Sequence, residues 1–173
     1  MLPLELKPIG FDTWEKEPWE SYCSRLSLPE NEGVLQFFRQ VPYDHFDHFN
    51  ERYPSFHIDH YEMCLKKMTA TEAASNIKFF GNREVAMWCW QYDEFERTNQ
   101  NYPVFRFMSE NGTPPFPPVV IDPRNLQHDH YIYGKPLHLI EGTHRLSYLI
   151  RMLERELIMP ESVHEFVLVS PLL

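Results

Sequence analysis

The amino-acid sequence predicts an α+β fold, and two patterns in its C-terminal third carry that prediction. Residues 143–158 repeat leucine and isoleucine at helical spacing, which is typical of a helix with one buried face. Short apolar runs bounded by turn residues predict strands at 119–121, 137–140 and 166–169. A chain of 173 residues has the size of one domain, so these elements are expected to share a fold.

The composition is that of a folded protein with an acidic surface. A chain with 43% hydrophobic and 15% aromatic residues can bury roughly two thirds of its unfolded surface, which argues against intrinsic disorder. The 16 Lys and Arg are outnumbered by 25 Asp and Glu, for a formal net charge of −9. Affinity for nucleic acid comes largely from cationic side chains, so this charge argues against nucleic acid as the main ligand but leaves room for a local basic pocket.

The cysteines and the hydropathy pattern predict a soluble cytoplasmic protein with no membrane partner. Cys23, Cys64 and Cys89 are odd in number and widely spaced, so we expect buried thiols in a reducing compartment. The N-terminus lacks the basic and apolar regions of a leader peptide, and no apolar run has the length needed to span a bilayer.

The N-terminal part of the sequence predicts an arm followed by short helices. Three prolines among residues 1–20 favour an extended arm, which Trp14 and Trp19 are expected to dock onto the body. The apolar spacing of residues 21–38 predicts short helices that are broken around 29–33.

The middle of the chain predicts one strand, two helices and a loop. Residues 56–65 alternate loosely in hydropathy, as a strand does. Thr69 and the glutamate that soon follows it predict a helix start, and that helix is expected to close at 81–82. A second helix is predicted over 84–95; its aromatic residues have acidic neighbours, which indicates a core helix and not a base-stacking platform. The proline-rich passage, residues 114–118, predicts a surface loop.

A strand, a glycine turn and a helix follow one another at 137–158, and this order predicts an anion site. Gly142 precedes the helix, whose first backbone N–H groups and positive dipole end attract anions. His144 and Arg145 fall in the first helical turn, where cations oppose the dipole and call for an anionic partner. That partner is either a bound ligand or a carboxylate of the chain. In the second case Arg145 pairs with Glu141 or another acid, and His144 caps a loop or packs under the proline-rich passage.

Two adjacent motifs resemble the ParB/sulfiredoxin-like superfold. They are Ile-Glu-Gly-Thr-His-Arg-Leu-Ser-Tyr-Leu at 140–149 and Pro-Pro-Val-Val-Ile-Asp at 117–122. Members of that family pair a strand that follows two prolines with a later strand that ends in acidic-Gly-x-His-Arg at the start of a helix. The resemblance implies a small mixed sheet with packed helices over 56–173, preceded by an N-terminal arm and helical extension over 1–55.

The resemblance also implies a nucleotide or phosphate site at the glycine turn. Gly142 would let the backbone approach a phosphate, Thr143 would offer its N–H and hydroxyl, and His144 and Arg145 would contact the phosphate oxygens. Glu141 would act as a base or help to hold a metal ion. The implied ligands are ATP, ADP or CTP with Mg²⁺. The wall facing this turn is expected to be residues 118–122, with Pro118 and Asp122 among the binding residues.

Two departures from the family narrow its implied activities. Thr143 occupies the position at which sulfiredoxins have cysteine, which argues against repair of sulfinic acids by a thiol. Only 15 residues follow position 158, which argues against the helix-turn-helix domain of the partition proteins.

We therefore expect a protein that binds a nucleotide or another phosphorylated ligand at residues 141–145. If it is an enzyme, the site favours phosphoryl transfer or phosphoester hydrolysis, with Glu141 and His144 as the catalytic candidates. The alternative is a non-enzymatic acidic protein, such as an immunity protein, an antitoxin or a phage-defence antagonist, which binds a basic protein partner.

A cluster of potential metal ligands lies at Asp44-His45-Phe-Asp47-His48, with His57 and His60 soon after it. On a helix, positions 44, 47 and 48 would face the same side, so a metal-dependent hydrolase is a third hypothesis. None of the spacings is that of the H-E-x-x-H zinc motif, and the pattern favours core-facing phenylalanines with Asp and His in solvent. No metal site is therefore expected.

Overall fold

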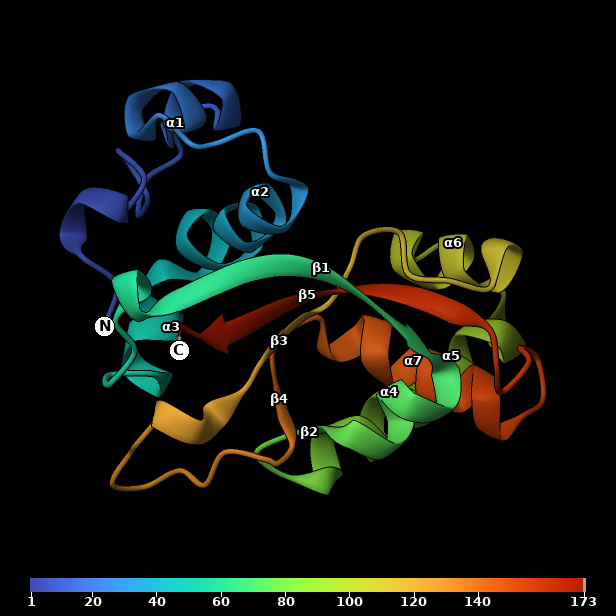
Figure 1. Ribbon diagram of the computed structural model, residues 1–173. Coiled ribbons are helices and arrows are strands. Elements are labelled where there is room, and N and C mark those ends of the chain that lie inside the picture. The colour runs from blue at the N-terminus through green and yellow to red at the C-terminus, as the bar shows by residue number, and fades with distance from the viewer. Residues whose placement is uncertain (173) are drawn as a thin grey trace.

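The computed structural model, which describes residues 1–172, has a five-stranded mixed sheet between two layers of helices (Figure 1). The strand order is β1-β5-β3-β4-β2. β1 pairs with β5 and β3 with β4 in antiparallel fashion, whereas β5 with β3 and β4 with β2 are parallel. The strands are β1 Tyr61–Thr69, β2 Ile77–Lys78, β3 Val119–Ile121, β4 Leu137–Glu141 and β5 Val163–Pro171. The predicted α+β class is confirmed.

The N-terminal helices cover one face of the sheet, and alternate residues of β3 and β5 supply the contact. Val119, Ile121, Val167 and Val169 belong to the same buried cluster as the aromatic residues of these helices. The elements of this layer are 3₁₀ helices at Leu4–Leu6 and Ile58–His60, a π-helix at Arg39–Tyr43, and α1 Trp19–Leu26, α2 Glu32–Phe38 and α3 Asp44–Arg52.

The opposite face of the sheet carries the remaining helices. Val120, Leu139 and Phe166 point to this side and form a second buried cluster with them. The helices are α4 Ala70–Asn76, α5 Asn82–Thr98, α6 Pro103–Asn111 and α7 Thr143–Glu154, and a 3₁₀ turn at Pro123–Asn125 follows β3.

The prediction of an extended N-terminal arm is wrong. Pro3 and Pro18 instead stand at the starts of short helices, where a missing N–H costs no hydrogen bond. Trp19 docks as expected, because its ring lies 5.3 Å from that of Tyr43 in the π-helix, but Trp14 is 92% exposed.

Several element boundaries differ from the sequence-based prediction. The helix after Thr69 has the expected capping box but ends at Asn76, because the chain enters β2 there. The strand predicted at 56–65 begins at Tyr61, after a 3₁₀ turn. α7 ends four residues early, since Glu156 adopts a left-handed φ of 56° that no α-helix continues. α6, which begins with Pro103, was not predicted.

Two further expectations concern the thiols and the membrane. Cys64 is exposed on β1, so the expectation of buried thiols is wrong for that residue, while Cys23 and Cys89 are half-buried. Within residues 1–172, no helix combines the length and apolarity needed to cross a bilayer.

Gly33 allows α2 to approach β1 closely, and its replacement is a test of that packing. A Cβ at this position would lie 2.7 Å from the Cα of Cys64 and 2.8 Å from its carbonyl carbon, and strand backbone cannot move aside cheaply. We expect Gly33→Ala to lower the free energy of unfolding by about 1–3 kcal/mol despite the better helix propensity of alanine. Urea denaturation measures this, with Gly81→Ala, where a Cβ has open space, as the matched control. An unchanged urea midpoint for Gly33→Ala would contradict the close approach of α2 to β1.

Candidate functional site

A cleft of about 430 Å³ opens at the N-terminus of α7. β4 delivers Glu141 to its rim, and Gly142 then turns the chain into the helix with a left-handed φ of 103°. A Cβ on Gly142 would lie 2.9 Å from Cβ of Pro118 and 3.1 Å from the guanidinium carbon of Arg145. Both the backbone angle and the close packing therefore require glycine at this turn.

The first turn of α7 is uncapped. Gly142 offers no side chain to accept from the backbone N–H groups, and the first turn contains no acidic residue. The first three N–H groups of a 12-residue helix therefore lack a side-chain acceptor at the cleft, together with the positive end of the helix dipole. This is the local arrangement that binds anions in proteins.

Arg145 is the buried cation of the site, with 4% of its surface exposed. Its guanidinium donates to the carbonyl oxygens of Phe116 at 3.2 Å and Pro117 at 3.3 Å, and to Glu141 Oε1 at 3.4 Å. It also lies 4.1 Å from the centre of the Phe116 ring. Burial lowers the pKa of Arg145 to about 10, so it stays charged at neutral pH. The alternative pairing of Arg145 with Glu141 is thus confirmed, and the same side chain holds the proline-rich passage against α7.

Burial, the largest effect on His144, lowers its pKa and so favours the neutral imidazole. Its Nδ1 is hydrogen-bonded to the hydroxyl of Tyr102 at 2.7 Å, and its ring lies 3.6 Å from that of Trp88. The expectation that it caps a loop or packs under the proline-rich passage is wrong, because α5 and the residue preceding α6 enclose the ring instead. An uncharged imidazole also removes the conflict with the helix dipole that the sequence suggested.

The opposite wall of the cleft comes from the N-terminal layer. His45 Nε2 lies 3.8 Å from Glu141 Oε2 across the cleft. Asp44 pairs with Lys16 at 3.0 Å and with Arg39 at 3.9 Å. Gln40 is 4% exposed; its Nε2 donates to the carbonyl of Pro117, whereas its Oε1 is buried without a partner within the described residues.

The Asp44–His48 cluster does not face one side as the sequence suggested. Its helix is kinked at His45, whose φ of −136° and ψ of 32° are not helical. Asp44 and His45 therefore line the cleft, while Asp47 pairs with Lys7 at 2.8 Å. Within residues 1–172, no three His, Cys, Asp or Glu side chains converge as a metal site requires.

The structure gathers five of the predicted site residues in the cleft: Glu141, Gly142, Thr143, His144 and Arg145. Pro118 is buried beneath Gly142 and does not line the cleft. Asp122 is also absent from the lining, because the register of β3 on β4 places Val119 beside Glu141 and carries the strand away from it. Asp122 instead pairs with Arg124 at 2.8 Å.

The sequence indicates Asp44 and His45 only as candidate metal ligands, and sequence reasoning missed the remaining lining residues, of which Gln40, Tyr102 and Phe116 matter most. They come from three separate parts of the chain. Of these residues, only Phe116 could have been found from the sequence, because it stands within the proline-rich passage directly before the family-like motif.

Comparisons with protein-family models, curated proteins and solved structures return no match. β3 follows two prolines and pairs with β4, which leads through Gly142 into α7, and this is the local pairing that the resemblance implies. Membership of the ParB/sulfiredoxin-like superfold stays a prediction.

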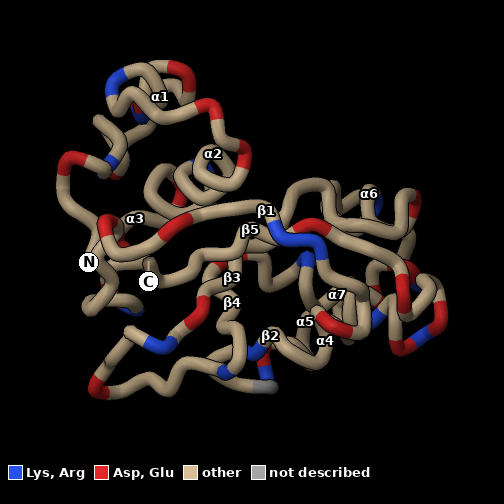
Figure 2. Tube along the Cα trace, in the orientation of Figure 1, with Lys and Arg blue, Asp and Glu red and all other residues tan. Residues whose placement is uncertain are grey.

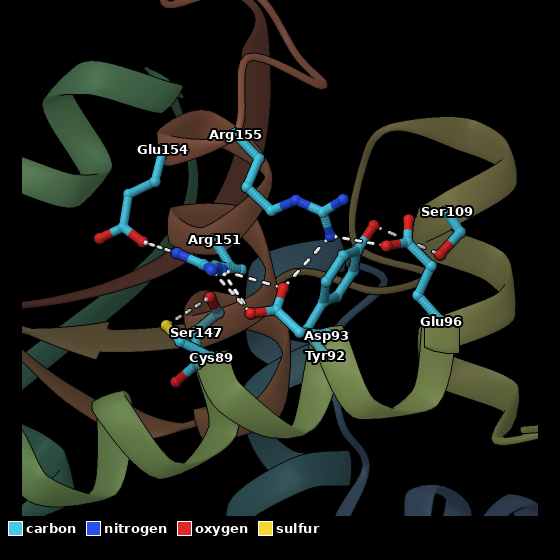
Figure 3. A network of polar contacts seen from close by, with 9 residues as sticks. All are labelled: Cys89, Tyr92, Asp93, Glu96, Ser109, Ser147, Arg151, Glu154 and Arg155. Atoms are coloured by element: carbon cyan, nitrogen blue, oxygen red, sulfur yellow. Dashed lines mark hydrogen bonds and ion pairs between the residues drawn. The ribbon is translucent and has the colours of Figure 1, made fainter. Parts of the chain in front are cut away.

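A network of ion pairs joins α5 to α7 (Figure 3). Asp93 accepts from Arg151 at 2.6 Å and from Arg155 at 3.2 Å, and Arg155 also reaches Glu96 at 2.8 Å. These pairs join the two helices at the turn after Trp88, and so set where its indole meets His144. None of the network's residues lines the cleft, so its link to the site is the contact of Trp88 with His144.

Proposed function

We propose that this protein binds a phosphorylated small ligand, of the class of ATP, ADP or CTP, in the cleft at the N-terminus of α7. The observation that carries the proposal is the uncapped first turn of α7, whose N–H groups border a cleft of about 430 Å³. That volume lies within the usual range for small-molecule sites.

The charges around the cleft support an anion on balance. The guanidinium of Arg145 is buried and positive, and the carboxylate of Asp44 is offset by Lys16 and Arg39. Glu141 is then the acid beside the proposed anion, and Arg145 and His45 flank it. In phosphoryl transfer or phosphoester hydrolysis, Glu141 is the base that would take the proton of the attacking hydroxyl or water.

Thr143 provides the sharpest test, because the required variant should keep the fold. Thr143→Glu places a carboxylate at the first helical position, where it favours the dipole and competes with an external anion. Thr143→Gln has the same size without the charge. Titration calorimetry with ADP, ATP, CTP and inorganic phosphate, each with and without Mg²⁺, should show binding to the wild type and to Thr143→Gln. We expect at least tenfold weaker binding by Thr143→Glu, at an unchanged or higher melting temperature.

Two results would contradict this function. The first is background heat for every ligand with folded wild-type protein. The second is equal affinity of Thr143→Glu and Thr143→Gln, because the ligand would then bind away from the first turn of α7. Release of phosphate from ATP, compared between the wild type and Glu141→Gln, tests turnover separately from binding.

A second candidate function, a non-enzymatic protein that binds a basic protein, is favoured by the distribution of charge. Carboxylates occur on both helical layers and on the sheet (Figure 2). Within the described residues, ion pairs engage ten of the 16 Lys and Arg but leave fourteen of the 25 Asp and Glu outside them. Such a surface attracts and complements a basic partner. Affinity capture from the cell of origin at low and high salt tests it, and a lack of any salt-sensitive protein partner would contradict it.

A further inference from the structure

Residues 9–17, called here the Trp14 loop, form a closed loop whose two ends are bonded to each other. The N–H of Ile9 donates to Glu17 Oε1 at 2.8 Å, and the N–H of Glu17 donates back to the carbonyl of Ile9 at 2.9 Å. Arg25 of α1 forms an ion pair with the same carboxylate at 2.6 Å. The carbonyl of Glu17 accepts a hydrogen bond from the hydroxyl of Tyr43 at 2.6 Å. The ends of the loop are therefore fixed to the N-terminal helices.

The turn inside the loop is also constrained. Gly10 has a left-handed φ of 69°, and a Cβ there would lie 2.6 Å from the carbonyl oxygen of Glu15. The carbonyl of Gly10 accepts from both the N–H and the hydroxyl of Thr13, at 2.9 Å each. Such a loop loses little conformational entropy when it binds a partner.

The Trp14 loop sorts its large apolar side chains into two groups. Phe11 turns inward, with its ring 6.5 Å from that of Phe46. Trp14 and Ile9 turn outward and are 92% and 63% exposed. Tryptophan is the side chain most enriched among residues that dominate binding energy at protein interfaces, and here a constrained loop presents one with no cover within the described residues.

The charges on the loop indicate what would cover it. Asp12 and Glu15 flank the indole in sequence, and both are exposed. Lys7 is shared between Asp12 and Asp47, and Lys16 pairs with Asp44, whereas Glu15 is in no ion pair within the described residues, so the loop and its surroundings keep an excess of negative charge. We infer that the Trp14 loop is the docking surface for a basic protein, which receives the indole in an apolar pocket bordered by arginine or lysine. Arginine at that border also gains a cation–π contact with the indole.

This inference rests on the second candidate function and is independent of the cleft on α7. The carboxylates beside the indole disfavour nucleic acid and acidic membranes. A second copy of this chain would bring its own net charge of −9 to the contact, so it is a poorer occupant than a basic protein.

The experiment compares four forms of the full chain as bait in extracts of the cell of origin. They are the wild type, Trp14→Ala, the Asp12→Asn/Glu15→Gln pair, and Trp90→Ala. Trp90 is 63% exposed on α5, on the far side of the sheet, and serves as the matched control. Proteins that the wild type captures are identified, purified and titrated against each form at 50 and 500 mM salt. Thermal melts confirm that every form is folded.

We expect a basic protein whose affinity falls at least tenfold with Trp14→Ala and is unchanged with Trp90→Ala. The Asp12→Asn/Glu15→Gln pair should weaken binding and flatten its salt dependence. A partner that binds the wild type and Trp14→Ala equally would overturn the role of the loop while leaving the interaction function intact. Capture of no protein would overturn both, and a partner that is acidic, a nucleic acid or a second copy of the chain would overturn the chemistry assigned to the occupant.

Discussion

Replacement of Arg145 by alanine is expected to lower the free energy of unfolding by roughly 3–5 kcal/mol, because it leaves two carbonyl oxygens without their donor and opens a cavity where a buried side chain was. The variant leaves the carbonyl oxygens of Phe116 and Pro117 without their donor and removes the buried partner of Glu141. It also opens a cavity beneath the Phe116 ring. Arg145→Lys should recover little, because an ammonium cannot reach two carbonyls and a carboxylate in the fork geometry of a guanidinium.

Urea denaturation of the variant and of a matched control measures this effect. Arg97 pairs with Glu94 on the surface of α5, and its side chain is 70% exposed. Arg97→Ala should therefore keep the wild-type urea midpoint. If Arg145→Ala and Arg97→Ala unfold at the same urea concentration, Arg145 does not hold the proline-rich passage. A lower unfolding free energy with retained ligand binding would mean that Arg145 acts on the fold and not on the anion.

The parts of the site that lie close together in sequence could be predicted from it. The strand 137–140, the glycine turn and the start of α7 at Thr143 follow from local spacing, and five neighbouring residues of that segment do line the cleft. The capping box at Thr69 is equally local and was also predicted. In each case the deciding interactions join residues a few positions apart, so the pattern can be recognised in the sequence.

The opposite wall could not be predicted, because it depends on contacts between distant segments. The π-helix at 39–43 and the kink at His45 redirect Asp44 and His45 toward Glu141, about a hundred positions away in the chain. Tyr102 meets His144 only because α5 and α6 pack on α7. The prolines of the N-terminal segment predict breaks in regular structure, whereas in the folded chain Pro3 and Pro18 stand at helix starts. The propensity of single residues does not determine whether a proline breaks a segment or starts a helix.

The stability of the protein is expected to fall as the pH falls from 6.5 to 4, and His138 is the largest single cause. This residue of β4 is completely buried; its Nδ1 accepts from the N–H of Gly134, and its Nε2 is hydrogen-bonded to the hydroxyl of Tyr53, both at 3.1 Å. Burial, and then the charge of Arg52, lower its pKa from 6.5 to about 4. The unfolded chain thus takes up a proton below pH 6.5, whereas the folded chain resists it until about pH 4.

The sign and size of the effect follow from that difference. The contribution of His138 is complete above pH 6.5 and is lost on acidification, at a cost of roughly 3 kcal/mol by pH 4. His144 and His164 act in the same direction, because burial lowers the pKa of each. Urea denaturation between pH 4.5 and 7.5 should give His138→Asn a lower free energy of unfolding than the wild type at pH 7. The slope of that free energy against pH should be smaller in the variant, by an amount that corresponds to close to one proton. The exposed His57→Asn is the control and should keep the wild-type slope. An unaltered slope in His138→Asn would mean that His138 takes up its proton without unfolding the core around β4.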